Sequence, residues 1–160
     1  KRSFEAFARL HEHHPTNFAY LDNLFDLSQQ LDKSNSYQVG LLDKMHSIQP
    51  ENLHVLELLA DKTSSLRWIN AGLKLDAQSG RLNFLKGDFY YKKWNNDSAK
   101  QDSVRALTWY RKARTDAQWR GNAQRMIDEL DPPLSDEEKK RREFFNKSKK
   151  KEEIEVTGKK

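Results

Sequence analysis

Residues 82–123 read LNFLKGDFYYKKWNNDSAKQDSVRALTWYRKARTDAQWRGNA, and this stretch decides the fold that the sequence predicts. It contains small and aromatic residues at helical spacing. Gly87 stands three residues before Tyr90, and Ala106 stands four residues before Tyr110. Two antiparallel helices approach closely only where small residues of one helix face large residues of the other. We therefore expect a tightly packed helical hairpin in which Gly87 and Ala106 mark the crossing and the two tyrosines fill the groove around it.

This spacing is typical of a tetratricopeptide repeat, which reads L-G-x-x-Y and then A-x-x-x-F. Such repeats stack so that each helical hairpin contacts only its neighbours. The predicted fold class is therefore all-α, with about seven helices in antiparallel hairpins stacked as a tetratricopeptide-like α-solenoid. The residues expected to pack between the helices of these repeats are Gly87, Tyr90, Ala106, Tyr110, Ala113, Trp119 and Ala123.

The composition of the 160 residues suits an elongated array. Apolar residues make up 36% and charged residues 33%, which is too polar for one compact core, yet 4 Trp, 5 Tyr and 8 Phe argue against wholesale disorder. The absence of cysteine excludes disulfides and thiolate metal sites. No apolar run approaches the length of a membrane span, so we expect no membrane insertion.

Helical apolar spacing also covers the sequence before this stretch. Pro15 and Pro50 are 35 residues apart, close to the repeat period of about 34, and each is followed by x-N and a leucine-rich segment. The chain begins with Lys1, and helical spacing starts at Phe4, so we expect a piece of a longer protein. The predicted division is helical repeats over 1–133 and a charged tail over 134–160 that is partly helical and then disordered.

Residues 95–102 are expected to form a surface loop inserted in the hairpin. Nineteen positions separate Gly87 from Ala106, where ordinary repeats leave about twelve. The excess, NNDSAKQD, has Ala99 as its only apolar residue. Inserted loops of this kind usually face a partner or nothing at all.

The tail accounts for most of the net positive charge. It carries 10 Lys/Arg against 7 Asp/Glu, which leaves 19 against 17 for residues 1–133. A nucleic-acid groove needs clustered basic charge on the folded part, so nucleic acid is not a favoured partner. Ser135 and Glu138 form a capping-box pattern, which predicts a short helix whose Phe144 and Phe145 dock onto the last hairpin.

The sequence offers no catalytic, metal or cofactor motif. The cluster His11-Glu12-His13-His14 lacks the H-E-x-x-H spacing that places two ligands on one helical face. Phosphate-loop, dinucleotide-binding and nucleophile-elbow patterns are absent as well. We therefore expect a non-enzymatic protein with no metal, no cofactor and no small-molecule substrate.

Trp109 is the first candidate for contact with a partner. It precedes Tyr110, so it is expected to point away from the packing face, as an exposed anchor would. Basic residues near it, which can clamp an acidic peptide segment, complete the candidate partner-binding set: Trp109, Arg111, Arg114 and Arg120. The alternative is a solvated face without a partner.

The continuation of the opening stretch resembles a segment of the large tetratricopeptide subunit of intraflagellar transport complex A. That family shows N-Y-x-K-G, then A-L, then K-A-R-x-D, then Trp and N-A. The matching residues here are Asn83 to Gly87, Ala106-Leu107, Lys112-Ala113-Arg114, Asp116, Trp119 and Asn122-Ala123. Upstream, Pro15 to Phe18 and Leu24 to Leu27 resemble the preceding family repeat. The resemblance extends from Phe4 to Leu130 and departs from the family over 53–65, over 95–102 and after Pro133.

The resemblance implies a scaffold in a long superhelical rod. Its expected partners are other protein subunits of complex A, and its expected location is the cilium or flagellum and the cytoplasm, in retrograde transport and ciliary cargo entry. One alternative is a generic tetratricopeptide peptide-binding module such as a cochaperone, although the usual Lys, Asn and Arg clamp for a carboxylate is not recognisable. Another is an RNA-binding helical-repeat protein, which would depend on the basic tail over 147–160.

A fragment of a solenoid exposes apolar faces at its ends. We therefore expect the isolated chain to self-associate as its concentration rises, which sedimentation velocity over a dilution series will measure. A single monomeric species at every concentration would contradict this expectation.

Overall fold

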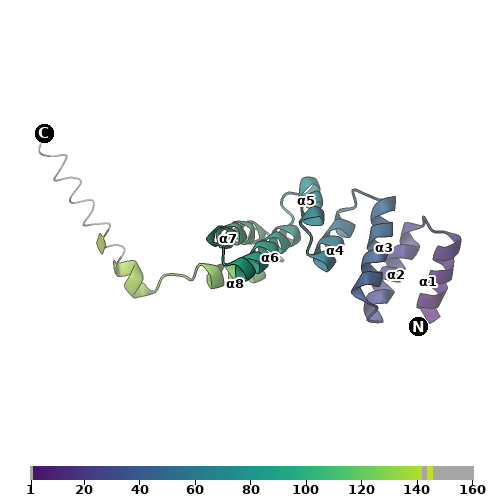
Figure 1. The fold of residues 1–160 in the computed structure, drawn as a ribbon, viewed down its shortest axis with the longest axis horizontal. Helices are drawn as coiled ribbons and strands as arrows, with labels where there is room; N and C mark the ends of the chain where they lie inside the picture. Colours follow the sequence, from purple (N-terminus) through teal and green to yellow (C-terminus); the bar gives the residue numbers. More distant parts are fainter. Residues whose placement is uncertain (1, 142–143, 146–160) are drawn as a thin grey trace, which may run out of the picture.

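The computed structural model describes residues 2–141 and 144–145 (Figure 1). These residues contain no strand, which confirms the all-α prediction. Before the tail, the described residues form one helix more than the seven expected: α1 (Arg2–His13), α2 (Phe18–Gln30), α3 (Asn35–Ile48), α4 (Leu53–Thr63), α5 (Leu66–Leu75), α6 (Gly80–Asp97), α7 (Lys100–Ala113) and α8 (Arg120–Leu130). Within the tail, residues 136–141 and 144–145 are helical too.

The helices lie in a row, with α1 at one end and α7 and α8 near the other (Figure 1). Extensive contacts join each helix to the next one along the chain, from α1 through α8, and α4 also contacts α6. Packing between sequence neighbours is what a solenoid requires. The arrangement is therefore consistent with the predicted α-solenoid, while the tetratricopeptide type of repeat stays a prediction.

Short polar side chains set where five of the helices begin. The N-cap residues of α2 to α6 are Asn or Ser, and each accepts a hydrogen bond from a backbone N–H of the first turn at 3.2 to 3.3 Å. Such a cap contributes about 1 kcal/mol because it satisfies a donor that the helix itself leaves unpaired. These caps are Asn17, Ser34, Asn52, Ser65 and Ser79.

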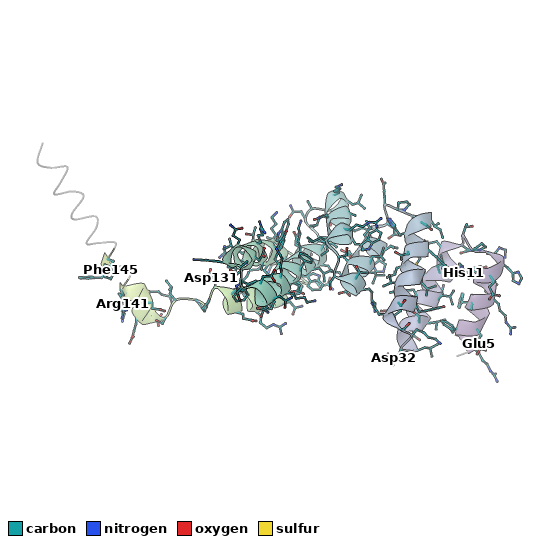
Figure 2. The ribbon with its side chains drawn as sticks, viewed as in Figure 1. Glu5, His11, Asp32, Asp131, Arg141 and Phe145 are labelled. Carbon is teal, nitrogen blue, oxygen red and sulfur yellow. The ribbon has the colours of Figure 1, made fainter. Side chains whose placement is uncertain are left out.

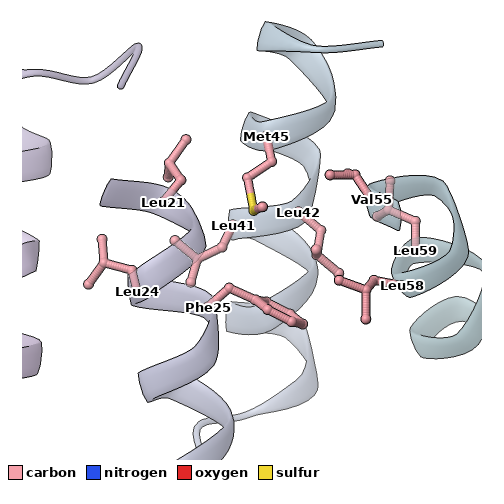
Figure 3. Close-up of a cluster of buried hydrophobic side chains, with 9 residues drawn as sticks. All are labelled: Leu21, Leu24, Phe25, Leu41, Leu42, Met45, Val55, Leu58 and Leu59. Carbon is pink, nitrogen blue, oxygen red and sulfur yellow. The ribbon is translucent and has the colours of Figure 1, made fainter. Parts of the chain in front are cut away.

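The buried apolar side chains form separate clusters along the row. The largest joins α2, α3 and α4 (Figure 3) and consists of Leu21, Leu24, Phe25, Leu41, Leu42, Met45, Val55, Leu58 and Leu59. A second joins α4, α5 and α6 through Ala60, Ile69 and Leu82. A third, with Ala106, Tyr110 and Ile127, joins α7 to α8 and is covered by aromatic residues of α6. Because α4 contributes to the first two clusters and α6 to the last two, these helices link one cluster to the next.

The closest helix crossing lies between α6 and α7. A Cβ atom added to Gly87 would lie 2.5 Å from Cε1 of the Tyr110 ring, closer than side chains can approach. Ala106 and Tyr110 are both fully buried, and Phe84 packs against the same ring with a centroid separation of 5.3 Å. The Tyr110 hydroxyl donates a hydrogen bond to Asp88 Oδ1 at 2.7 Å. The small-against-large pairing expected from the sequence is thus present between Gly87 and Tyr110.

The predicted surface loop over 95–102 is wrong. Helix α6 continues to Asp97 and α7 begins at Lys100, so only Ser98 and Ala99 join them, with Ser98 in the left-handed region at φ 52°. The segment is polar because residues 95–101 are exposed at the ends of two long helices. The polar composition correctly indicated solvent exposure, but exposed residues can belong to a helix as well as to a loop.

The expected docking of Phe144 and Phe145 onto the last hairpin is also wrong. Their exposed fractions are 69% and 62%, and Phe145 lies well beyond Asp131, away from the row of helices (Figure 2). The capping box itself forms: Glu138 N donates to Ser135 Oγ at 3.2 Å, and Ser135 N donates to Glu138 Oε2 at 2.9 Å. The part of the tail predicted to be disordered, 147–160, lies outside the described residues.

Replacing Gly87 by Ala is expected to lower the free energy of unfolding by about 1–3 kcal/mol, because the new methyl group overlaps the Tyr110 ring. Gly121→Ala in α8 is the matched control, since nothing lies within 4 Å of the added Cβ. There the change is expected to stabilise by up to about 1 kcal/mol through helix propensity. Urea denaturation followed by far-ultraviolet circular dichroism measures both. An equal effect of the two substitutions would contradict the close crossing.

Candidate functional site

One face of the α6–α7 hairpin combines cations with aromatic rings. Lys86 Nζ lies 3.9 Å from the ring centroid of Trp109, and the Arg105 guanidinium carbon lies 5.6 Å from that of Tyr90. Further along, Lys93 Nζ lies 3.0 Å from a carboxylate oxygen of α7. The residues on this surface, which we call the cation–aromatic face, are Lys86, Tyr90, Lys93, Asp102, Arg105, Trp109 and Lys112.

The sequence positions show that these contacts share one side of the hairpin. The contacts pair residue 86 with 109, 90 with 105, and 93 with 102, so each step forward along α6 matches an equal step back along α7. Steps of three and four residues return to the same side of a helix. The row of contacts therefore follows the antiparallel register of α6 and α7.

Trp109 holds two ammonium groups at one end of this face. Lys112 Nζ lies 4.2 Å from the Trp109 centroid, in addition to Lys86 at 3.9 Å. Cations near an indole ring are attracted by its electron-rich face. Lys86 also donates a hydrogen bond to Asn70 Oδ1 of α5 at 2.7 Å, but that acceptor is neutral. Of the ion pairs between described residues, none includes Lys86 or Lys112.

The environment of Lys86 disfavours its positive charge. The side chain is half-buried, and this desolvation lowers the pKa of the Lys86 ammonium below its ordinary value, with a further decrease from the nearby charge of Lys112. These are two separate causes, burial and like-charge repulsion, and no ion pair among the described residues opposes them.

The other end of the cation–aromatic face is compensated by Asp102. Its side chain is 2% exposed and accepts from Lys93 at 3.0 Å and from Arg105 at 2.9 Å. The hydrogen bond from Lys93, together with that from Arg105 and the charges of both, holds the pKa of the Asp102 carboxyl below its ordinary value despite the cost of desolvation. The position in the first turn of α7 adds a favourable interaction with the helix dipole.

The structure does not bring the four predicted partner-binding residues together. Trp109 is half-buried between Lys86 and Lys112 rather than an exposed anchor. Arg111 donates to Asp131 at 2.9 Å and Arg114 donates to Gln124 at 3.0 Å, so both are directed towards α8 and its end. Residues two positions apart on a helix point in directions that differ by about 200°, so Arg111 lies on the other side of α7 from Trp109. Arg120 is exposed at the start of α8.

The predicted packing residues are mostly buried. Side chains that are fully buried include Ala106, Tyr110, Ala113 and Ala123, and Gly87 is buried as well. Trp119 is half-buried and packs on Phe84 with a centroid separation of 5.0 Å. Tyr90 is half-buried: it packs against the cluster of Ala106, Tyr110 and Ile127, and Arg105 lies over its ring on the cation–aromatic face.

Sequence reasoning did not name Lys86, Lys93, Asp102 or Arg105 of this face as candidate site residues. A signal was present, because 86, 90 and 93 on one segment and 105, 109 and 112 on the other carry cations and aromatic residues at helical spacing. The mispredicted loop over 95–102 hid it, since Asp102 was not expected to belong to a helix.

The histidine cluster shows no arrangement for a metal. Within residues 2–141 and 144–145, no group of three or more His, Cys, Asp or Glu side chains is placed to hold an ion. The ring nitrogen Nε2 of His11 lies 3.3 Å from Lys44 Nζ, and burial followed by this charge lowers the pKa of His11. Over the same residues, no helix has both the length and the apolar character needed to cross a bilayer.

Comparison with known proteins adds no further assignment. Neither family models nor curated proteins give a match to this chain. The class of molecule defined by the fold and the surface is therefore a row of antiparallel helices that exposes a cation–aromatic face.

Replacing Asp102 by Asn is expected to lower the free energy of unfolding at neutral pH, because Lys93 and Arg105 lose their shared carboxylate. Since the folded-state pKa of Asp102 is depressed below its ordinary value of 3.8, its contribution is present above pH 3.8 and is lost as the pH falls through the folded-state value. The difference in free energy of unfolding between wild type and variant should therefore become smaller in acid. Urea titrations at about pH 7 and about pH 3 measure it.

Asp43→Asn serves as control, because Asp43 is an exposed carboxylate of α3 outside the ion pairs described. This variant should match the wild type at both pH values. If the loss of unfolding free energy caused by Asp102→Asn were the same at both pH values, this would contradict the electrostatic origin of the effect.

Proposed function

We propose that this protein is a non-enzymatic scaffold whose row of helices binds other proteins. The observation that carries the proposal is the packing of each helix against its sequence neighbours from α1 to α8. Such an arrangement buries one part of each hairpin and leaves long surfaces facing solvent, which repeat proteins use to bind partners. The separate apolar clusters along the row support the same conclusion.

More specifically, we propose that the chain is a segment of the large tetratricopeptide subunit of intraflagellar transport complex A. Its support is the sequence resemblance over the opening stretch and its continuation through Trp119 and Ala123. Several of the resembling residues have packing roles: Gly87 meets Tyr110, and Ala106, Ala113 and Ala123 are fully buried. In this proposal the chain acts in cilia or flagella and the cytoplasm, and its partners are other complex A subunits.

Co-elution with the remaining complex A subunits tests this proposal. The purified chain is mixed with those subunits and applied to size-exclusion chromatography, and we expect it to elute with at least one of them. Tyr110→Asp should abolish co-elution because it places a charge in the fully buried crossing between α6 and α7. Gly121→Ala, which adds a methyl group in open space, should leave it unchanged.

Two outcomes would overturn parts of the proposal. Absence of co-elution with every complex A subunit would overturn the ciliary assignment. Co-elution that survives Tyr110→Asp, with circular dichroism showing the loss of helix, would contradict the role of the folded row of helices.

A further inference from the structure

We infer that the Lys86–Trp109–Lys112 end of the cation–aromatic face binds an acidic peptide segment of a partner protein, through carboxylates that accept hydrogen bonds from the two lysines. The inference rests on the proposed scaffold function and specifies its partner by charge.

The two ammonium groups form a concentrated positive site. Lys86 Nζ and Lys112 Nζ lie 3.9 and 4.2 Å from one ring centroid, so the two nitrogens are at most about 8 Å apart. Charge-assisted hydrogen bonds to a carboxylate are about 2.8 Å long, so neighbouring acidic side chains of one peptide segment can each reach one of the lysines. The cations repel each other in the free protein, and a bound anion removes this repulsion. The lowered pKa of Lys86 agrees with this reading.

The other end of the same face shows what such a carboxylate does. Asp102 lies between Lys93 and Arg105 at 3.0 and 2.9 Å and is almost fully buried. Each end therefore has two cations from the two helices, but the chain supplies a carboxylate to only one of these pairs among the described residues. Acidic residues of a partner would supply the carboxylates that this second pair lacks.

The partially buried setting favours binding at this end. Lys86 and Trp109 are half-buried, and Asn70 fixes the Lys86 ammonium by a hydrogen bond at 2.7 Å. An ion pair formed by a positioned and partly desolvated cation is stronger than one between mobile surface charges. Trp109 holds both lysines in place, so less side-chain freedom is lost when the anion binds.

The charge distribution favours a peptide over a nucleic acid or a membrane. Residues 1–133 carry 19 Lys/Arg against 17 Asp/Glu, so the positive site is local. A phosphate backbone needs a continuous basic track, and on this face the track ends at Asp102. A peptide with a few acidic residues matches a site that is about one helical turn long.

Fluorescence anisotropy with a fluorescein-labelled hexaglutamate peptide tests the inference on the whole chain. We expect saturable binding that weakens as salt is added, and no binding of a hexaglutamine peptide with the same label. The double variant Lys86→Gln with Lys112→Gln should weaken hexaglutamate binding at least tenfold. Trp109→Leu should also weaken it, because the two ammonium groups lose the ring that positions them.

A matched double variant controls for total charge. Lys92→Gln with Lys100→Gln removes one exposed lysine from α6 and one from α7, outside the cation–aromatic face, and should change the affinity less than twofold. Circular dichroism checks that each variant keeps its helix content. Equal weakening by the two double variants would overturn the inference, as would a wild-type chain that binds no hexaglutamate.

Two further arms address the other partner classes. Tighter binding of a 20-nucleotide oligouridine, or of phosphatidylserine vesicles, that is lost in Lys86→Gln with Lys112→Gln would overturn the assignment to a peptide. If the wild-type chain binds no hexaglutamate but still co-elutes with complex A subunits, the peptide site is overturned and the proposed function stands. If the chain binds hexaglutamate but co-elutes with no complex A subunit, the peptide site stands and the assignment to complex A is overturned.

Discussion

The contact between the Tyr110 ring and Gly87 determines how the second half of the molecule is built. Because any side chain at position 87 would overlap that ring, α6 and α7 lie as close as helices with side chains allow. The ring is fully buried, so its hydroxyl needs a partner, and it donates to Asp88 Oδ1 at 2.7 Å. Burial raises the pKa of Asp88, which the hydrogen bond opposes, and burial together with the Asp88 hydrogen bond raises the pKa of Tyr110.

The same close crossing organises the electrostatics of the cation–aromatic face. With the two helices held in one register, residues of α6 meet residues of α7 at every turn of the cation–aromatic face. One buried carboxylate, Asp102, compensates two cations at one end, while Lys86 and Lys112 share an indole ring at the other. Structure and candidate binding site thus depend on one helix pair.

The sequence predicted features that depend on local spacing. Gly87 and Tyr110 were expected at a helix crossing, and the capping box expected of Ser135 and Glu138 forms. It failed where the partner lies far along the chain: the position of Lys86 beside Trp109 requires the register of two helices. Polarity also misled the reading of 95–102, because exposed helix ends and loops have the same composition. For the same reason the basic residues next to Trp109 in sequence, such as Arg111, are not its neighbours in space.

A double-mutant cycle between Gly87→Ala and Tyr110→Leu tests the crossing most directly, with the free energy of unfolding measured for all four proteins. If the ring occupies the space beside Gly87, the cost of the added methyl group should largely disappear once the ring is removed. This corresponds to a coupling energy of at least about 1 kcal/mol. Additive effects, with the same cost of Gly87→Ala beside Tyr110 and beside Leu, would contradict the account.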